Sequence, residues 1–185
     1  MEINPDEKTY DLGGDIFLKE LRVEDINNSY LGWFKDEQVT EFLDAKNISK
    51  EDAVNHLLKG IETKSYYMYA IIAKDSWLHI GNVKIGPINW QHLVADLPVI
   101  IGLPSYWGKG LASEAIKIGN HISFNVFGLR KLSGAIASGN VGSIKAYTKG
   151  NWIIEGKLKD HLLINGVAQD KVMVSCFNPV FFNNL

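Results

Sequence analysis

The feature that most restricts the fold of this chain is a short apolar run that leads through a glycine-rich turn into an amphipathic helix. Residues 97–101 are apolar and partly β-branched, as in a buried strand, and apolar residues recur at helical spacing between residues 111 and 126. The connecting residues 102–110 read Gly-Leu-Pro-Ser-Tyr-Trp-Gly-Lys-Gly. Glycines let the backbone approach a ligand closely, and the N–H groups and dipole of the following helix favour an anion. The order strand, glycine turn, helix therefore predicts a phosphate-binding site.

Two common glycine-rich phosphate sites do not fit the spacing of this turn. In a P-loop, G-x-x-x-x-G-K is followed by a Ser or Thr that binds magnesium. Here five residues separate Gly102 from Gly108, and Gly110 stands where the hydroxyl residue belongs. The dinucleotide pattern G-x-G-x-x-G also fails, because Ser113 occupies the place of the third glycine. Taken alone, the turn also fits an ordinary connection between a strand and a helix.

A second pattern lies downstream, where Asn140, Ser143 and Tyr147 follow an apolar run over residues 132–137 as N-x-x-S-x-x-x-Y. Asn140 is well placed to cap a helix that begins after it, and Ser143 lies on the same helix face as Tyr147. By themselves these residues are also compatible with a half-buried helix of purely structural role. Together with the glycine turn, however, they resemble the GNAT acetyltransferase family.

In the GNAT family, a turn of pattern [Q/R]-x-x-G-x-[G/A] holds the pyrophosphate of acetyl-CoA. Residues 107–112 match it at Gly110 and Ala112 but carry Trp107 at the Gln/Arg position. The Tyr-Trp-Gly-Lys-Gly variant is similar to the branch of ribosomal-protein-alanine acetyltransferases. The resemblance extends over residues 16–177 and implies a GNAT-like fold. It also implies a slot for the pantetheine arm between the strand before the turn and a parallel strand that begins near Lys131.

The resemblance implies a set of acetyl-CoA-binding residues along the first wall of this slot, in the turn and at the second pattern. These are Ile100, Ile101, Gly102, Trp107, Gly108, Lys109, Gly110, Leu111, Ala112, Ser113, Asn140 and Ser143. In the family, most contacts with the phosphates are made by backbone N–H groups, so the absence of a Gln or Arg at position 107 is tolerable. Lys145 or Lys149 can reach the 3′-phosphate of the ribose.

Two residues are candidates for catalysis. Tyr147 matches the family tyrosine that gives its phenolic proton to the departing CoA sulfur, a role that suits a hydroxyl of pKa about 10. Asp96 stands eleven residues before Trp107, the offset at which some family members place a glutamate base. An unperturbed aspartate is a weak base, so Asp96 is expected to act through water. His92 and His121 are alternatives by residue type.

The remaining pattern predicts a single α+β domain over residues 1–185, with a mixed, mostly antiparallel sheet flanked by helices. Ser49 and Asp52 form a capping-box signature at the start of a helix. The expected strands are 15–21, 66–73, 78–88, 93–101, 131–137, 152–157 and a hairpin 162–177 that turns at Asn165–Gly166, with the three central strands in an antiparallel meander. The expected helices open at Val23, Glu37, Ser49, Leu111 and Gly142, and Gly128 ends the fourth of them.

Composition narrows the class of protein further. The apolar runs are shorter than the roughly 20 residues that span a bilayer, the N-terminus lacks the pattern of a signal peptide, and Cys176 is the only cysteine, so we expect a cytoplasmic protein. A net charge of −2 argues against general nucleic-acid binding. Residues 1–62 carry 15 acidic and 7 basic side chains and residues 63–185 carry 6 and 12, so the phosphate-binding patterns lie in the basic part. No cluster has metal-ligand spacing.

The sequence therefore predicts an acetyl-CoA-dependent N-acetyltransferase that works by direct attack of a primary amine. The segment 30–42 is similar to relatives that act on protein α-amines and on amino groups of nucleotide sugars, so an amino sugar or a peptide N-terminus is the first expectation for the acceptor. The acidic first part of the chain favours instead a polyamine or aminoglycoside. A non-catalytic acetyl-CoA sensor and a P-loop nucleotide binder are rival classes, and the chain is compatible with a homodimer.

Overall fold

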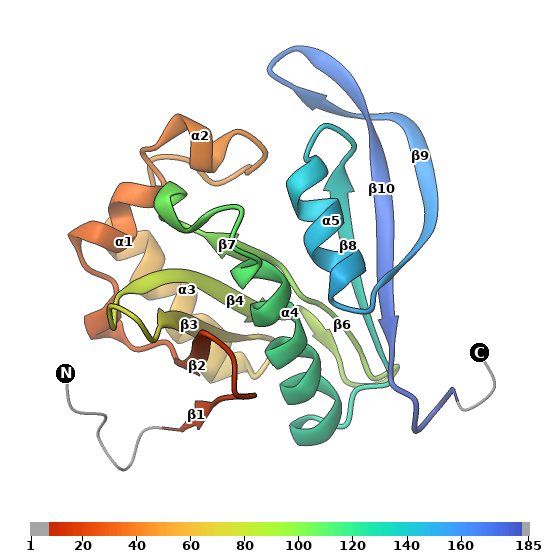
Figure 1. The fold of residues 1–185 in the computed structure, drawn as a ribbon, viewed down its shortest axis with the longest axis horizontal. Helices are drawn as coiled ribbons and strands as arrows, with labels where there is room; N and C mark the ends of the chain where they lie inside the picture. The colour runs from red at the N-terminus through yellow and green to blue at the C-terminus, as the bar shows by residue number, and fades with distance from the viewer. Residues whose placement is uncertain (1–7, 183–185) are drawn as a thin grey trace.

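The computed structural model describes residues 8–182, whose strands form two five-stranded sheets (Figure 1). The first sheet, in spatial order, contains β1 (Thr9–Tyr10), β2 (Ile16–Glu20), β3 (Tyr67–Ala73), β4 (His79–Ile85) and β7 (Val99–Ile101). The second contains β5 (Ile88–Asn89), β6 (Val94–Asp96), β8 (Lys131–Ala137), β10 (Val167–Phe177) and β9 (Ile153–Ile164). Among the described strands only β6 and β8 pair in parallel. The predicted α+β class with mostly antiparallel pairing is confirmed.

Four of the five predicted helices begin near their predicted starts, but the helix expected to open at Val23 is only a 3₁₀ turn there, and the α-helix begins at Asn28 after its cap Asn27. The helices are α1 (Asn28–Trp33), α2 (Glu37–Thr40), α3 (Lys50–Thr63), α4 (Leu111–His121) and α5 (Val141–Lys149), with short 3₁₀ turns at Val23–Asp25 and Pro104–Tyr106. The side chain of Ser49 accepts a hydrogen bond from the Asp52 N–H at 3.0 Å, which confirms the N-cap of α3, while the Asp52 carboxylate accepts from the Ser49 hydroxyl instead of from the backbone N–H of a full capping box. Helix α4 continues as a π-helical segment, Ile122–Val126, that stops just before Gly128 at φ 65°.

The central meander differs from the prediction because two expected strands are each divided between the sheets. The segment 78–88 gives β4 and β5, and the segment 93–101 gives β6 and β7. Pro87 and Pro98 lie at the two breaks, and proline cannot donate a hydrogen bond to a neighbouring strand. At the C-terminal end, β9 is one long strand rather than two pieces, and its hairpin with β10 turns at Asn165–Gly166 as predicted.

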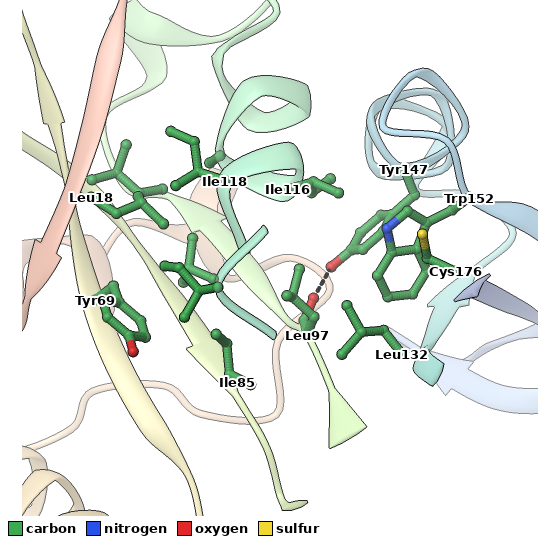
Figure 2. Packing of buried hydrophobic residues seen from close by; sticks show 14 of the residues in the cluster. Leu18, Tyr69, Ile85, Leu97, Ile116, Ile118, Leu132, Tyr147, Trp152 and Cys176 are labelled. Atoms are coloured by element: carbon green, nitrogen blue, oxygen red, sulfur yellow. Dashed lines mark hydrogen bonds between the residues drawn. The ribbon is translucent and has the colours of Figure 1, made fainter. Parts of the chain in front are cut away.

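Helices cover both faces of the first sheet, and each face has its own apolar cluster. Helix α4 packs on one face in a cluster that also reaches the second sheet, as Figure 2 shows through Leu18, Ile118, Leu97, Leu132 and Trp152. Helices α1 and α3 cover the other face in a second cluster. The first sheet is therefore buried on both sides, while its edge strand β7 faces the second sheet.

Leu97, between β6 and β7, is the side chain on which the junction of the two sheets packs. It is fully buried, and a Cβ added to Gly119 would lie 2.8 Å from its Cδ1, so α4 passes directly against it. We expect Leu97→Ala to lower the free energy of unfolding by about 2–5 kcal/mol, as other buried leucine truncations do. Urea denaturation measures this. Leu163→Ala is the control, because Leu163 is 73% exposed and its loss should change stability by less than about 0.5 kcal/mol. Equal losses in both variants would contradict the packing role of Leu97.

Candidate active site

A cavity of about 600 Å³, here called cavity A, opens where β7 and β8 separate. β6 pairs in parallel with β8, and the Leu97 N–H still donates to the Ser133 carbonyl at 3.2 Å. Beyond that point the chain turns away, and β7 pairs instead with β4. β7 is the last strand of its sheet, so one of its edges has no strand partner. The predicted slot between two diverging strands is therefore present.

Ile100 and Ile101 of β7 line cavity A, as predicted. An extended ligand that lies along an open strand edge can pair with its backbone N–H and C=O groups, as an added strand does. The open edge of β7 therefore fits the amide groups of a pantetheine arm.

The glycine turn forms one end of cavity A and has the geometry of an anion site. Gly108 and Gly110 have φ values of 74° and 85°, which only glycine adopts readily. No side chain of the described residues caps the N-terminus of α4, so the N–H groups of its first turn, Leu111 to Ser113, are left for a ligand. A Cβ at either glycine would meet no protein atom within 4 Å. The turn is thus open space lined by donors, which fits a pyrophosphate.

A second helix N-terminus, that of α5, reaches the same cavity. The Asn140 side chain accepts a hydrogen bond from the Ser143 N–H at 3.1 Å, so the predicted capping role is confirmed, and both residues line cavity A. The Ser113 hydroxyl donates to the Ala146 carbonyl at 2.8 Å and so ties α4 to α5. Two helix dipoles therefore point their positive ends into one cavity.

Tyr147 lines cavity A from α5 and is almost completely buried, with 6% of its surface exposed. Its hydroxyl donates a hydrogen bond to the Leu97 carbonyl at 2.5 Å (Figure 2). The ring packs edge-to-face on Trp152 with the ring centroids 4.8 Å apart. Burial raises the pKa of Tyr147 well above its usual value, so the phenol keeps its proton at neutral pH. Tyr147 is therefore a protonated phenol held by a hydrogen bond at the point where the two sheets separate.

Most of the predicted residues line cavity A, namely Ile100, Ile101, Trp107, Gly108, Gly110, Leu111, Ala112, Ser113, Asn140, Ser143 and Tyr147. Three predicted residues lie outside its lining. The Gly102 N–H donates to the Ile80 carbonyl, the Lys109 ammonium lies 4.7 Å from the centroid of the Tyr106 ring, and exposed Asp96 accepts a hydrogen bond from the Ser133 hydroxyl at 2.6 Å. The roles of these three residues remain predictions.

The lining also includes residues outside the predicted set of cofactor-binding residues. The segment from α2 into the following loop contributes Gln38, Val39, Glu41, Phe42 and Leu43, which lie more than fifty residues from the glycine turn in sequence. No local pattern connects a short polar helix with a distant phosphate turn. Lys145 and Lys149 of α5 line the cavity as well, in agreement with their proposed place near a 3′-phosphate.

A second cavity of about 490 Å³, here called cavity B, lies between the first sheet and helices α1 and α3. It shares Leu43, Val99 and Ile100 with cavity A. Its other lining residues are Tyr30, Phe34, Asp44, Ala45, Ile48, Asp52, Ala53, His56, Met68, Asn82, Lys84 and Pro98. The sequence contains a signal for this cavity, because Asn82 and Lys84 are polar residues two positions apart and so lie on one face of their strand.

Two properties of the described residues concern other classes of site. Residues 8–182 contain no group of three or more His, Cys, Asp or Glu side chains placed to hold a metal ion. Over the same range, none of the helices has the length and apolar character needed to cross a membrane.

The chain is similar to proteins of known class. Residues 15–150 match the acetyltransferase (GNAT) domain. Spermidine N(1)-acetyltransferase of Escherichia coli K12 is 34% identical over 97 residues, which are 52% of this chain and 52% of that protein, so the match spans about half the length of the relative.

Solved structures share the fold. Spermidine N-acetyltransferase from Vibrio cholerae, in complex with CoA and spermine, superposes with a TM-score of 0.81 at 22% identity and covers 91% of this chain and 99% of that one. Ribosomal-protein-S5-alanine acetyltransferase from Vibrio fischeri gives 0.79 at 18% identity, with 92% and 97% covered. Since the matched domain takes up most of its length, this chain belongs to the GNAT acetyltransferase family.

Proposed function

We propose that this chain is an N-acetyltransferase that moves the acetyl group of acetyl-CoA to a primary amine by direct attack. The observation that carries the proposal is that the glycine turn, the capped N-terminus of α5 and the Tyr147 side chain all line cavity A, although they come from separate segments. The uncapped first turn of α4 fits the pyrophosphate, and the open edge of β7 fits the pantetheine amides.

When bound, acetyl-CoA supplies a thioester whose carbonyl carbon an amine can attack, with the thiolate as leaving group. Tyr147, whose hydroxyl otherwise donates a hydrogen bond to the Leu97 carbonyl, then gives its proton to the departing sulfur. The attacking nitrogen must also lose a proton. Asp96, which lies outside the lining, can receive it only through water, and the Ser133 hydroxyl holds its carboxylate in place.

The acceptor is a primary amine, and two observations favour different kinds. The similarity to spermidine acetyltransferases favours a polyamine or another cationic amine, and so does the negative charge of Glu41 in cavity A. The earlier resemblance of residues 30–42 favours an amino sugar or a peptide α-amine. A sensor without turnover predicts a different result, because it would bind acetyl-CoA and release no free CoA thiol with any amine. Assays of thiol release with these amines separate the three cases.

Tyr147→Phe tests the proton donor. Without the hydroxyl, the thiolate leaves unprotonated, so we expect kcat to fall by about 10²-fold while acetyl-CoA affinity changes little. Thiol release gives kcat, and calorimetry gives the affinity. Tyr106→Phe is the matched control, because Tyr106 also lines cavity A but its hydroxyl bonds to Ser76 on the surface. An unchanged kcat in Tyr147→Phe would remove this residue as the acid.

Gly110→Trp tests the seat of the pyrophosphate. An indole at this position would fill the space beside the donors of α4, and the loss of two or three charge-assisted hydrogen bonds weakens acetyl-CoA binding by about 10²-fold or more. Gly128→Trp is the control, since Gly128 has a similar φ of 65° and equally open surroundings but lies outside cavity A. Calorimetric titration with acetyl-CoA measures both. Tight binding by Gly110→Trp would refute this placement.

A further inference from the structure

Cavity B lies next to cavity A, where an amine acceptor would bind before it receives the acetyl group. Cavities A and B share Val99 and Ile100 of β7 and Leu43 after α2, so the two cavities adjoin along these residues. A ligand in cavity B can therefore present an amine across β7 to a thioester in cavity A. The groups that line cavity B then decide which amines fit.

Asn82 supplies a hydrogen-bond donor to the floor of cavity B. Its side chain is 95% buried, since only 5% of the residue surface is exposed. Its Oδ1 atom lies 2.8 Å from Nε2 of His79, which acts as the donor to it. The Nδ2 group makes no hydrogen bond to any residue in the described part of the chain, and the residue lines the cavity. Because the residue lines the cavity and this group keeps its donor capacity, it can donate to an oxygen atom of a ligand there.

Lys84 adds a positive charge on the same side. It stands two residues after Asn82 on β4, so both side chains project from one face of the sheet. Lys84 is half-buried, and no carboxylate of residues 8–182 lies within ion-pair distance of its ammonium. Its Nζ atom lies 5.4 Å from the centroid of the Tyr66 ring. Burial lowers the pKa of Lys84, and the charge of the Asp96 carboxylate partly offsets this effect.

The other walls of cavity B are largely apolar, with polar groups from Tyr30 and His56, and its carboxylates are exposed. Phe34, Met68 and Ile100 contribute apolar surface. Asp44 and Asp52 are exposed, and Asp52 accepts a hydrogen bond from the Ser49 hydroxyl as part of the cap of α3. The interior polar groups that rise from the sheet are therefore donors, while the acceptors face solvent, where water and salt screen them.

We propose that cavity B binds the oxygen-bearing, anionic body of the amine acceptor, and that Asn82 and Lys84 determine its specificity. Asn82 donates to a hydroxyl or carbonyl oxygen, and Lys84 pairs with a phosphate or carboxylate. The acceptor class is a primary amine that carries such groups, as a phosphorylated amino sugar does. A polyamine carries only N–H donors and positive charge, so it offers nothing to either residue. This inference rests on the proposed acetyl transfer.

The experiment measures thiol release with matched pairs of amines that differ by one anionic group. Glucosamine 6-phosphate with glucosamine tests a phosphate, alanine with alaninamide tests a carboxylate, and spermidine tests a polyamine. We expect the anionic member of one pair to have the highest kcat/KM, at least about 10-fold above its neutral partner and above spermidine, as one charge-assisted bond allows. No preference within either pair, or the highest kcat/KM for spermidine, overturns the proposal.

Variants locate the preference. Lys84→Met should raise KM for the anionic amine, so that its kcat/KM falls to about that of the neutral partner. Lys84→Arg should retain most of the difference in kcat/KM between the two amines. Asn82→Leu should raise KM for both members of the preferred pair. Lys117→Met is the control, because Lys117 is exposed on α4 outside both cavities. An anionic preference that survives in Lys84→Met overturns the assignment. Thermal unfolding of each variant confirms that it is folded.

A direct binding measurement separates this inference from the proposed function. Calorimetry of the CoA-loaded protein with glucosamine 6-phosphate and with alanine needs no turnover. Binding of either ligand that is lost in Lys84→Met supports cavity B even if no thiol is released, and absence of binding by both ligands overturns it. Failure of the proposed function instead shows as a protein that does not bind acetyl-CoA, or that binds it and releases no thiol with any amine.

Discussion

The passage of one chain segment from one sheet to the other at Leu97 and Pro98 is the constraint on which the rest of this structure depends. Before it, β6 pairs with β8, and after it, β7 pairs with β4. Pro98 has no N–H to extend either ladder, and the Leu97 side chain anchors the junction in the core against α4. Because the segment leaves β8 at this point, an open strand edge borders cavity A on one side, and cavity B adjoins the same strand on the other.

The same junction fixes the candidate proton donor. The Leu97 carbonyl, freed from the strand ladder by the turn, accepts the Tyr147 hydroxyl, and Trp152 packs on the ring. A phenol held in this way has one rotamer and one pKa, both set by the core rather than by solvent. The chemistry of cavity A therefore depends on the packing between the two sheets, and loss of that packing would displace the donor as well as destabilise the fold.

The sequence predicted what is encoded locally. The cap of α3 at Ser49, the cap of α5 at Asn140 and the turn at Asn165–Gly166 depend on residues a few positions apart, and all three are present. The division of the central strands was not predicted, because the sequence shows Pro87 and Pro98 but not which of two sheets each half-strand joins. The α2 wall of cavity A and the whole of cavity B were missed for a similar reason, since they form only when distant segments pack.

Donor and acceptor sites in this chain differ in the kind of group that forms them, and this difference limits what similarity can transfer. The proposed phosphate seat consists of backbone N–H groups at helix N-termini and an open strand edge, which survive wide changes of sequence as long as the fold is kept. The proposed acceptor side depends on single side chains such as Asn82 and Lys84, which one substitution changes. Family membership and the shared fold therefore support acetyl-CoA as the acetyl donor of this chain. Relatives that match only about half of the chain do not establish which amine it acetylates. For the amine, Asn82 and Lys84 of cavity B are the stronger argument, because they are properties of this chain itself.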